Sequence, residues 1–94
     1  MAKRWTDLRL ATKEALFDDV QSENLSQLDK WGVQTHDPFE WLAYTTEELG
    51  ELSEAISEWM YRTGTPMAIY IEAIQVATLA LKIAEMARGE MHDV

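Results

Sequence analysis

The stretch of sequence that decides the fold is DPFEWLAYTTEELGELSEAISEWMYR, residues 37–62. It opens on a strong helix start, because Asp37 can cap the helix, Pro38 suits the first helical position and Glu40 stands where a capping box needs it. At about 100° per residue, its large apolar side chains share one face of a helix. They are Trp41, Leu49, Leu52, Ile56, Trp59 and Met60. We therefore predict an amphipathic helix from Pro38 to about Arg62.

The next helix is predicted to begin after a short break. Gly64 is expected to close the preceding helix in a left-handed conformation, Thr65 to cap the following helix and Pro66 to occupy its first turn. This helix is predicted to end near Arg88. Its apolar residues surround most of its circumference, which is typical of a helix buried on several sides. In so short a chain, this pattern predicts burial against a second copy of the protein.

The chain upstream is predicted to add one more helix. From Thr12 to about Lys30, apolar side chains recur at helical spacing on one stripe. They are Phe17, Val20, Leu28 and Trp31. Residues 1–11 either extend this helix or form a separate N-terminal arm, and residues 30–36 predict a loop. The fold class is therefore all-α, a small bundle of about three main helices in one domain, residues 1–94, completed by oligomerisation.

Composition excludes several classes of protein. The chain has no cysteine, which excludes a disulfide framework and a thiolate metal site. Its net charge of −9, from 8 basic and 17 acidic residues, repels nucleic-acid polymers. No run reaches about 18 uninterrupted apolar residues, and no apolar signal segment follows the basic N-terminus, so we expect no membrane span and a cytoplasmic location. A chain of 94 residues buries a modest fraction of its surface, which favours a homodimer or homotetramer.

One carboxylate stands inside the most apolar part of the chain. Glu72 is the only charged residue in the run from Met67 to Leu81. Burying it bare costs several kcal/mol, so it needs either an ion pair, with Lys82 or Arg62, or a bound cation.

A row of glutamates lies on the preceding predicted helix. Glu47, Glu51, Glu54 and Glu58 form a stripe opposite its apolar face, with Glu48 at the boundary. The stripe is either an ordinary solvated face or a set of repelling charges that a cation relieves. If Glu72 faces Glu48 and Glu51, the three carboxylates can share Mg²⁺, a hard cation that takes oxygen ligands. Neither His36 nor His92 has the Glu-x-x-His spacing of a ferritin-like di-iron site.

These acidic residues carry a resemblance to a known family. Glu48-x-x-Glu51, followed after twenty residues by Glu72-x-x-Gln75, resembles the ExxE…ExxD signature of the MazG-like all-α nucleoside triphosphate pyrophosphohydrolases. Segments around it resemble the small members of that family from phages and mobile gene cassettes. They are KWGVQ (30–34), WLA (41–43), TEELGEL (46–52) and EAIQVA (72–77). The resemblance covers roughly residues 12–88.

The resemblance implies an enzyme and its cofactor. Members of the family use Mg²⁺, for which Mn²⁺ can substitute, to cleave a (deoxy)nucleoside triphosphate into the monophosphate and pyrophosphate, and so clean the nucleotide pool. Their helical subunits assemble as dimers or dimers of dimers. By position, Glu48, Glu51 and Glu72 correspond to metal ligands. Gln75 stands where the family usually has Asp; its amide oxygen can ligate a metal, but it brings no charge and cannot act as a base.

Further residues are candidates for catalysis and substrate binding. Glu48 and Glu47 are the candidate catalytic carboxylates; Glu47 either takes a proton from water, bridges a second metal or is a solvated helix residue. Lys82, and less strongly Lys30, can contact phosphate. Trp31 either stacks on a nucleobase or packs in the core.

Two other classes of function stay open. A non-catalytic nucleotide-binding relative is compatible with the departure from the family signature at Gln75. A helical module that binds a basic partner through the acidic stripe is the other, although such a module has no need of Glu72 in its most apolar helix.

Overall fold

The computed structural model describes residues 3–91 and contains three α-helices. They are α1 (Lys13–Trp31), α2 (Pro38–Tyr61) and α3 (Pro66–Glu90). No strand occurs between residues 3 and 91. The prediction of an all-α fold with three main helices is therefore confirmed. His92 lies outside the described residues.

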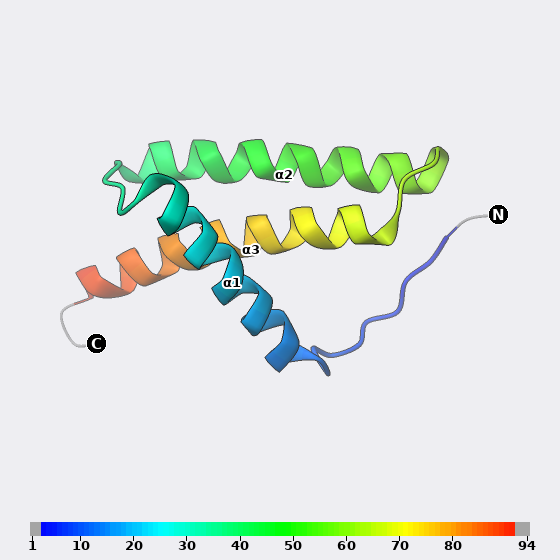
Figure 1. The fold of residues 1–94 in the computed structure, drawn as a ribbon, viewed down its shortest axis with the longest axis horizontal. Helices are drawn as coiled ribbons and strands as arrows, with labels where there is room; N and C mark the ends of the chain where they lie inside the picture. Colours follow the sequence, from blue (N-terminus) through cyan, green and yellow to red (C-terminus); the bar gives the residue numbers. More distant parts are fainter. Residues whose placement is uncertain (1–2, 92–94) are drawn as a thin grey trace.

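Helix α3 is the centre of the arrangement. Figure 1 shows α2 and α3 lying antiparallel, side by side, with α1 crossing α3 obliquely. Helix α3 contacts both of the others, whereas α1 and α2 pack on different sides of it. Residues of α2 and α3 that are far apart in sequence therefore face each other along the length of the pair, and α1 can reach the polar side of α3.

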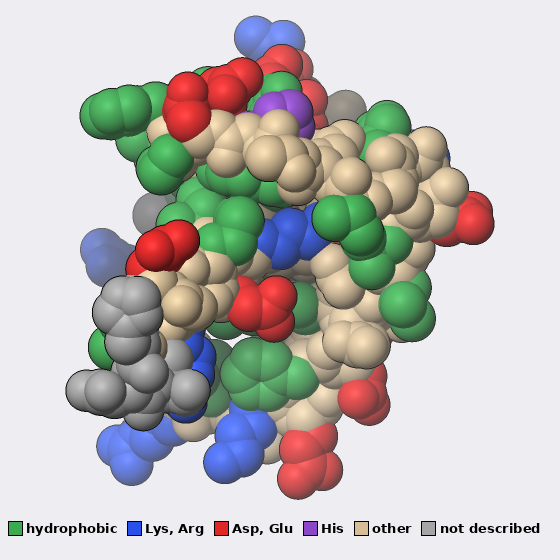
Figure 2. Space-filling model, turned by 90° about the vertical axis from the view of Figure 1, so that its left-hand side faces the viewer, with side chains coloured by type: hydrophobic (Ala, Val, Ile, Leu, Met, Phe, Trp, Pro, Cys, Tyr) green, Lys and Arg blue, Asp and Glu red, His purple; other side chains and the backbone are tan. Residues whose placement is uncertain are grey.

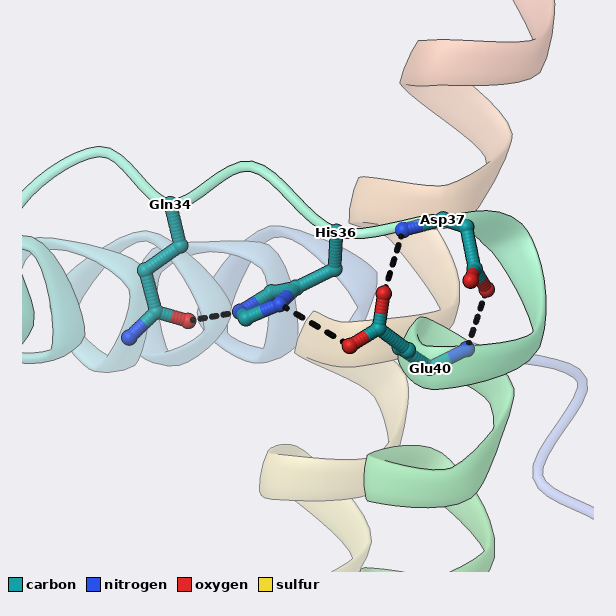
Figure 3. Close-up of polar contacts among 4 residues, drawn as sticks. All are labelled: Gln34, His36, Asp37 and Glu40. Atoms are coloured by element: carbon teal, nitrogen blue, oxygen red, sulfur yellow. Dashed lines mark hydrogen bonds and ion pairs between the residues drawn. The ribbon is translucent and has the colours of Figure 1, made fainter.

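The local signals place the helix starts as predicted. The Asp37 side chain accepts a hydrogen bond from the Glu40 backbone nitrogen at 2.9 Å, and the Glu40 carboxylate accepts one from the Asp37 nitrogen at 3.0 Å (Figure 3). This is a complete capping box in front of Pro38. The Thr65 hydroxyl accepts from the Ala68 nitrogen at 3.2 Å, which caps α3.

The prediction for Gly64 is wrong in its mechanism. Among the described residues Gly32, not Gly64, is the glycine with a positive φ, 70°. The Gly64 nitrogen instead donates to the Glu58 carbonyl oxygen at 3.1 Å and folds the chain back on the end of α2. A Cβ at this position would lie 2.6 Å from the Trp59 nitrogen, so close approach of two backbone segments, and not handedness, requires glycine here.

Residues 3–11 form an arm that is separate from α1. For these residues, the alternative that they extend the first helix is therefore wrong. Residues 3–8 are not helical, and Arg9 and Leu10 turn the chain into α1 with φ values of 56° and 54°. At its N-terminal end the described arm contacts the last turn of α2 through Lys3. The Lys3 ammonium donates to the Trp59 carbonyl oxygen at 2.5 Å and lies 4.2 Å from the centroid of that indole ring. Lys3 thereby satisfies a carbonyl at the C-terminal end of α2.

The core of a single chain is small. Its buried hydrophobic residues are Trp41, Ile69 and Leu79. The accessible surface is 7759 Å², well above the about 5500 Å² expected of a compact monomer of this mass. Many apolar side chains of the three helices stay exposed, and hydrophobic side chains are visible across the face in Figure 2. One chain therefore does not bury α3 on all of its apolar sides.

Helix α3 is also long and apolar enough to cross a membrane, by length and composition alone. Its most apolar stretch is 17% buried within this chain. Core helices of soluble proteins pass the same test when another surface covers them. The absence of a membrane span therefore stays a prediction.

Candidate metal centre

Three glutamates converge between α2 and α3. Glu48 and Glu51 lie one turn apart on α2, and Glu72 projects from the facing side of α3. One carboxylate oxygen from each lies within 4.8 Å of the others. The structure thus brings together the three residues that the sequence pattern placed around a cation. Their role as metal ligands stays a prediction.

The carboxyl groups of the cluster are partly buried and lie close together, so ionisation of all three is unfavourable. Partial burial, then repulsion by Glu51 and a hydrogen bond with its carboxyl group, and then the charges of Glu72 and Glu47, raise the pKa of Glu48 from 4.5 to about 7. Burial is also the main cause of the raised pKa of Glu72, followed by the charge of Glu51. Carboxyl groups that resist ionisation next to one another are stabilised by any cation that enters between them.

Gln75 bridges two of the three carboxylates. With the amide oriented by its hydrogen bonds, the nitrogen donates to Glu48 Oε2 at 2.9 Å and to Glu72 Oε2 at 3.0 Å. The opposite orientation would set the amide oxygen against two carboxylate oxygens. Ligation of a metal through the amide oxygen of Gln75 would need the amide to rotate, so this part of the predicted ligand set stays a prediction.

The alternative of an ion pair for Glu72 is not found among residues 3–91. The Lys82 ammonium donates instead to the amide oxygen of Gln27 at 2.5 Å. Arg62, the residue that follows the last turn of α2, lies 3.9 Å from the carboxylate of Glu58. Glu72 is therefore surrounded by other carboxylates and the Gln75 amide, and no basic side chain in the described part of the chain neutralises it.

A cavity of about 740 Å³ adjoins the cluster. Glu47, Glu48 and Gln75 form part of its wall, so it opens directly onto the acidic centre. All three residues predicted to bind substrate also line it: Lys30, Trp31 and Lys82. Figure 2 looks at the end of the molecule where the α1–α2 loop and the C-terminal half of α3 meet, and shows basic, acidic and hydrophobic side chains close together around a hollow. Trp31 is 60% exposed, which does not support a core role, and the Lys30 ammonium lies 5.1 Å from the centroid of its ring.

Sequence reasoning missed an aromatic part of this wall. The ring of His36 lies edge-on to Trp41 and to Tyr44, each with centroids 5.1 Å apart. Figure 3 shows His36 held between Gln34, at 3.2 Å, and Glu40, at 3.8 Å. The signal was the capping box itself, because a His placed just before it must lie over the first turns of α2, where the two aromatic residues stand.

A second cavity, of about 660 Å³, lies on the other side of the cluster. It is lined by Glu51, Glu54, Glu58 and Glu72 together with residues of the α2–α3 turn, and its lining includes no lysine or arginine from residues 3–91. The first cavity is also lined by four glutamates, Glu23, Glu47, Glu48 and Glu85, but Lys30 and Lys82 offset part of their charge, so a polyanion is repelled less there than in the second cavity.

No model of a known protein family, no curated protein and no solved structure matches this chain. The case for a function accordingly rests on the residue pattern and on the geometry described above.

Proposed function

We propose that the protein is a Mg²⁺-dependent nucleoside triphosphate pyrophosphohydrolase of the MazG-like type, acting in the clean-up of the nucleotide pool. It would convert a (deoxy)nucleoside triphosphate and water into the monophosphate and pyrophosphate. The observation that carries the proposal is the convergence of Glu48, Glu51 and Glu72 beside a cavity that also holds basic and aromatic side chains.

The donor set fits a hard cation. Three carboxylates supply oxygen ligands and excess negative charge, and none of the three is committed to a basic side chain within residues 3–91. Bound there, Mg²⁺ or Mn²⁺ would neutralise phosphate charge and lower the pKa of a bound water. Glu48, Glu51 and Glu72 are the proposed ligands, with Gln75 either as a fourth ligand or as the residue that orients two of them.

The chain's own side chains account for the remaining roles. Glu47 is exposed and lines the cavity beside Glu48, so it can take a proton from water at the edge of the centre. Lys82 and Lys30 provide positive charge for the phosphates from two different helices. Trp31 offers an exposed ring to a nucleobase.

The experiment is a panel of standard and modified (deoxy)nucleoside triphosphates, incubated with Mg²⁺ and assayed for both products. We expect equal amounts of monophosphate and pyrophosphate, with turnover lost in EDTA and restored by Mg²⁺ or Mn²⁺. Release of orthophosphate instead would contradict the assigned bond cleavage. Binding of a nucleotide without any turnover would favour the non-catalytic relative, for which Gln75 is the supporting observation. No response to metal or nucleotide would leave only the helical interaction module.

We also propose that the functional unit is a homodimer or homotetramer. The exposed area exceeds that of a compact monomer by an amount comparable with a protein–protein interface. Ile71, on the apolar helix α3, is 48% exposed. A second copy is a better cover for α3 than a lipid bilayer, because Glu72, Gln75 and Lys82 interrupt its apolar surface.

Light scattering after size exclusion is expected to give at least twice the chain mass of 10.8 kDa, without detergent. Ile71→Glu should shift the protein toward monomer by at least about tenfold in dissociation constant, since it places a charge in an apolar interface. Gln21→Glu, which adds the same charge on an exposed part of α1, is the matched control. A monomeric wild-type protein, or one that needs detergent to stay in solution, would contradict this assembly.

A further inference from the structure

The ammonium group of Lys82 lies in an unusual setting. It is half-buried in the wall of the 740 Å³ cavity, and burial lowers its pKa. It donates to a neutral partner, the amide oxygen of Gln27, at 2.5 Å, and within residues 3–91 it makes no ion pair with a carboxylate. Buried charges in proteins are normally paired. The Lys82 ammonium has three N–H donors, of which one is engaged by Gln27, so two donors and the positive charge are available to a ligand.

Gln27 is itself held in place. Its amide nitrogen donates to Glu23 Oε2 at 2.7 Å, one turn earlier on α1. Because the nitrogen is engaged by a carboxylate, the amide oxygen must point the other way, toward Lys82. The chain of contacts Glu23–Gln27–Lys82 therefore fixes the ammonium from a different helix, 55 residues away in sequence. The Glu23 charge partly offsets the effect of burial on the pKa of Lys82, but the direct hydrogen bond of the ammonium is to the neutral amide.

We propose that Gln27 is a positioning residue that holds the Lys82 ammonium through a neutral hydrogen bond in place of an ion pair, and that the two form an anchor for a phosphate group in the cavity. The ligand class is a di- or triphosphate chain. The inference rests on the proposed function for the identity of the full substrate, but the anchor itself requires only an anion. A neutral amide at position 27 orients the ammonium without neutralising it, which a carboxylate in the same place would do.

The test is calorimetric titration of the full chain with inorganic tripolyphosphate in magnesium buffer. Lys82→Met should lower the affinity for tripolyphosphate by about 10- to 100-fold, the effect of losing one hydrogen bond to a charged group. The informative variant is Gln27→Glu, which has the same shape. It should weaken tripolyphosphate binding by about tenfold or more, because the new carboxylate pairs with Lys82. The new ion pair and the new repulsion by Glu23 act on the melting temperature in opposite directions, so the affinity of the folded protein is the deciding measurement.

A purely structural role for Gln27 predicts a different result. Loss of packing would lower the melting temperature and leave tripolyphosphate affinity within about twofold once the protein is folded. Gln27→Met serves as a second variant: it should weaken binding by several-fold by releasing Lys82, but less than Gln27→Glu. Gln21→Glu adds the same charge on an exposed side of α1 and should change the affinity by less than about twofold.

Failure of the anchor and failure of the enzyme can be told apart. If Gln27→Glu binds tripolyphosphate as tightly as the wild type, the positioning role of Gln27 is wrong. If Lys82→Met also binds normally, there is no anchor at Lys82. If all variants behave as expected but no nucleoside triphosphate is hydrolysed, the anchor stands and the proposed reaction is what fails.

Discussion

Glu72→Gln and Glu48→Gln are each expected to reduce Mg²⁺-dependent pyrophosphate release by at least about 10³-fold while leaving the chain folded. Each removes one of the three carboxylates that lie within 4.8 Å of one another, and with it a charge that a divalent cation needs. The same substitution should make the metal-free protein more stable, because it removes repulsion and the cost of ionising a partly buried carboxyl group. Activity and stability should thus change in opposite directions.

The measurement combines a pyrophosphate assay with thermal unfolding, with and without Mg²⁺. Wild-type protein should gain stability on addition of Mg²⁺, and both variants should lose most of that gain. Glu54→Gln is the matched control, since Glu54 belongs to the same acidic stripe but is exposed and lies outside the cluster. It should keep activity within about threefold. Full activity in Glu48→Gln and Glu72→Gln together would show that the centre has been misassigned.

The convergence of these carboxylates was predictable because the signals that determine it are local. Asp37 and Pro38 fix where α2 begins, and Thr65 and Pro66 fix where α3 begins. Because only four residues connect α2 and α3, the two helices pack as antiparallel neighbours. Once both helices and the turn are set, positions on the two sides of the turn face each other in register, and Glu72 meets Glu48 and Glu51.

The wall of the cavity was only partly predictable, because its contacts are tertiary. Lys82 and Gln27 are far apart in sequence, and no spacing rule links α1 to one particular side of α3. The same holds for the arm, where Lys3 reaches the carbonyl group of Trp59. Periodicity shows which residues are apolar and which share a face, but not which element covers that face. For this reason the position of Gln27, which sequence patterns do not distinguish from any other polar helix residue, emerges only from the structure.

The Gly64 error has a similar origin. A glycine after a helix and before a new cap is most often left-handed, and the sequence gives no other indication. Here the backbone of the turn returns against α2 so closely that a Cβ would meet the nitrogen of Trp59 at 2.6 Å. The residue type was required, but for a steric reason that depends on the path of the turn in space.

The metal-free protein is expected to lose stability as the pH rises from about 4.5 to about 7, by about 1–2 kcal/mol. The pKa of Glu48 is about 7 in the folded protein and 4.5 as its ordinary value, so between these values the folded state holds a proton that the unfolded state has released. Stability must then fall with increasing pH, and it levels off above about 7. This change in the free energy of unfolding is about half of the value expected for a fully buried carboxyl group, because Glu48 is partly exposed to solvent.

Magnesium should reverse this slope. A cation competes with protons for the same carboxylates, so Mg²⁺ should stabilise the protein little near pH 5 and most above pH 7. Thermal unfolding across this range in EDTA and in Mg²⁺ measures both effects, with a difference of about 4–8 °C for each kcal/mol. Glu48→Gln should remove most of the slope in EDTA, whereas Glu54→Gln should keep it. A metal-free protein that instead becomes more stable between pH 5 and 7 would contradict the prediction. It would mean that these carboxylates are ionised and already paired with positive charge, so that no uncompensated negative charge is left for a cation to bind.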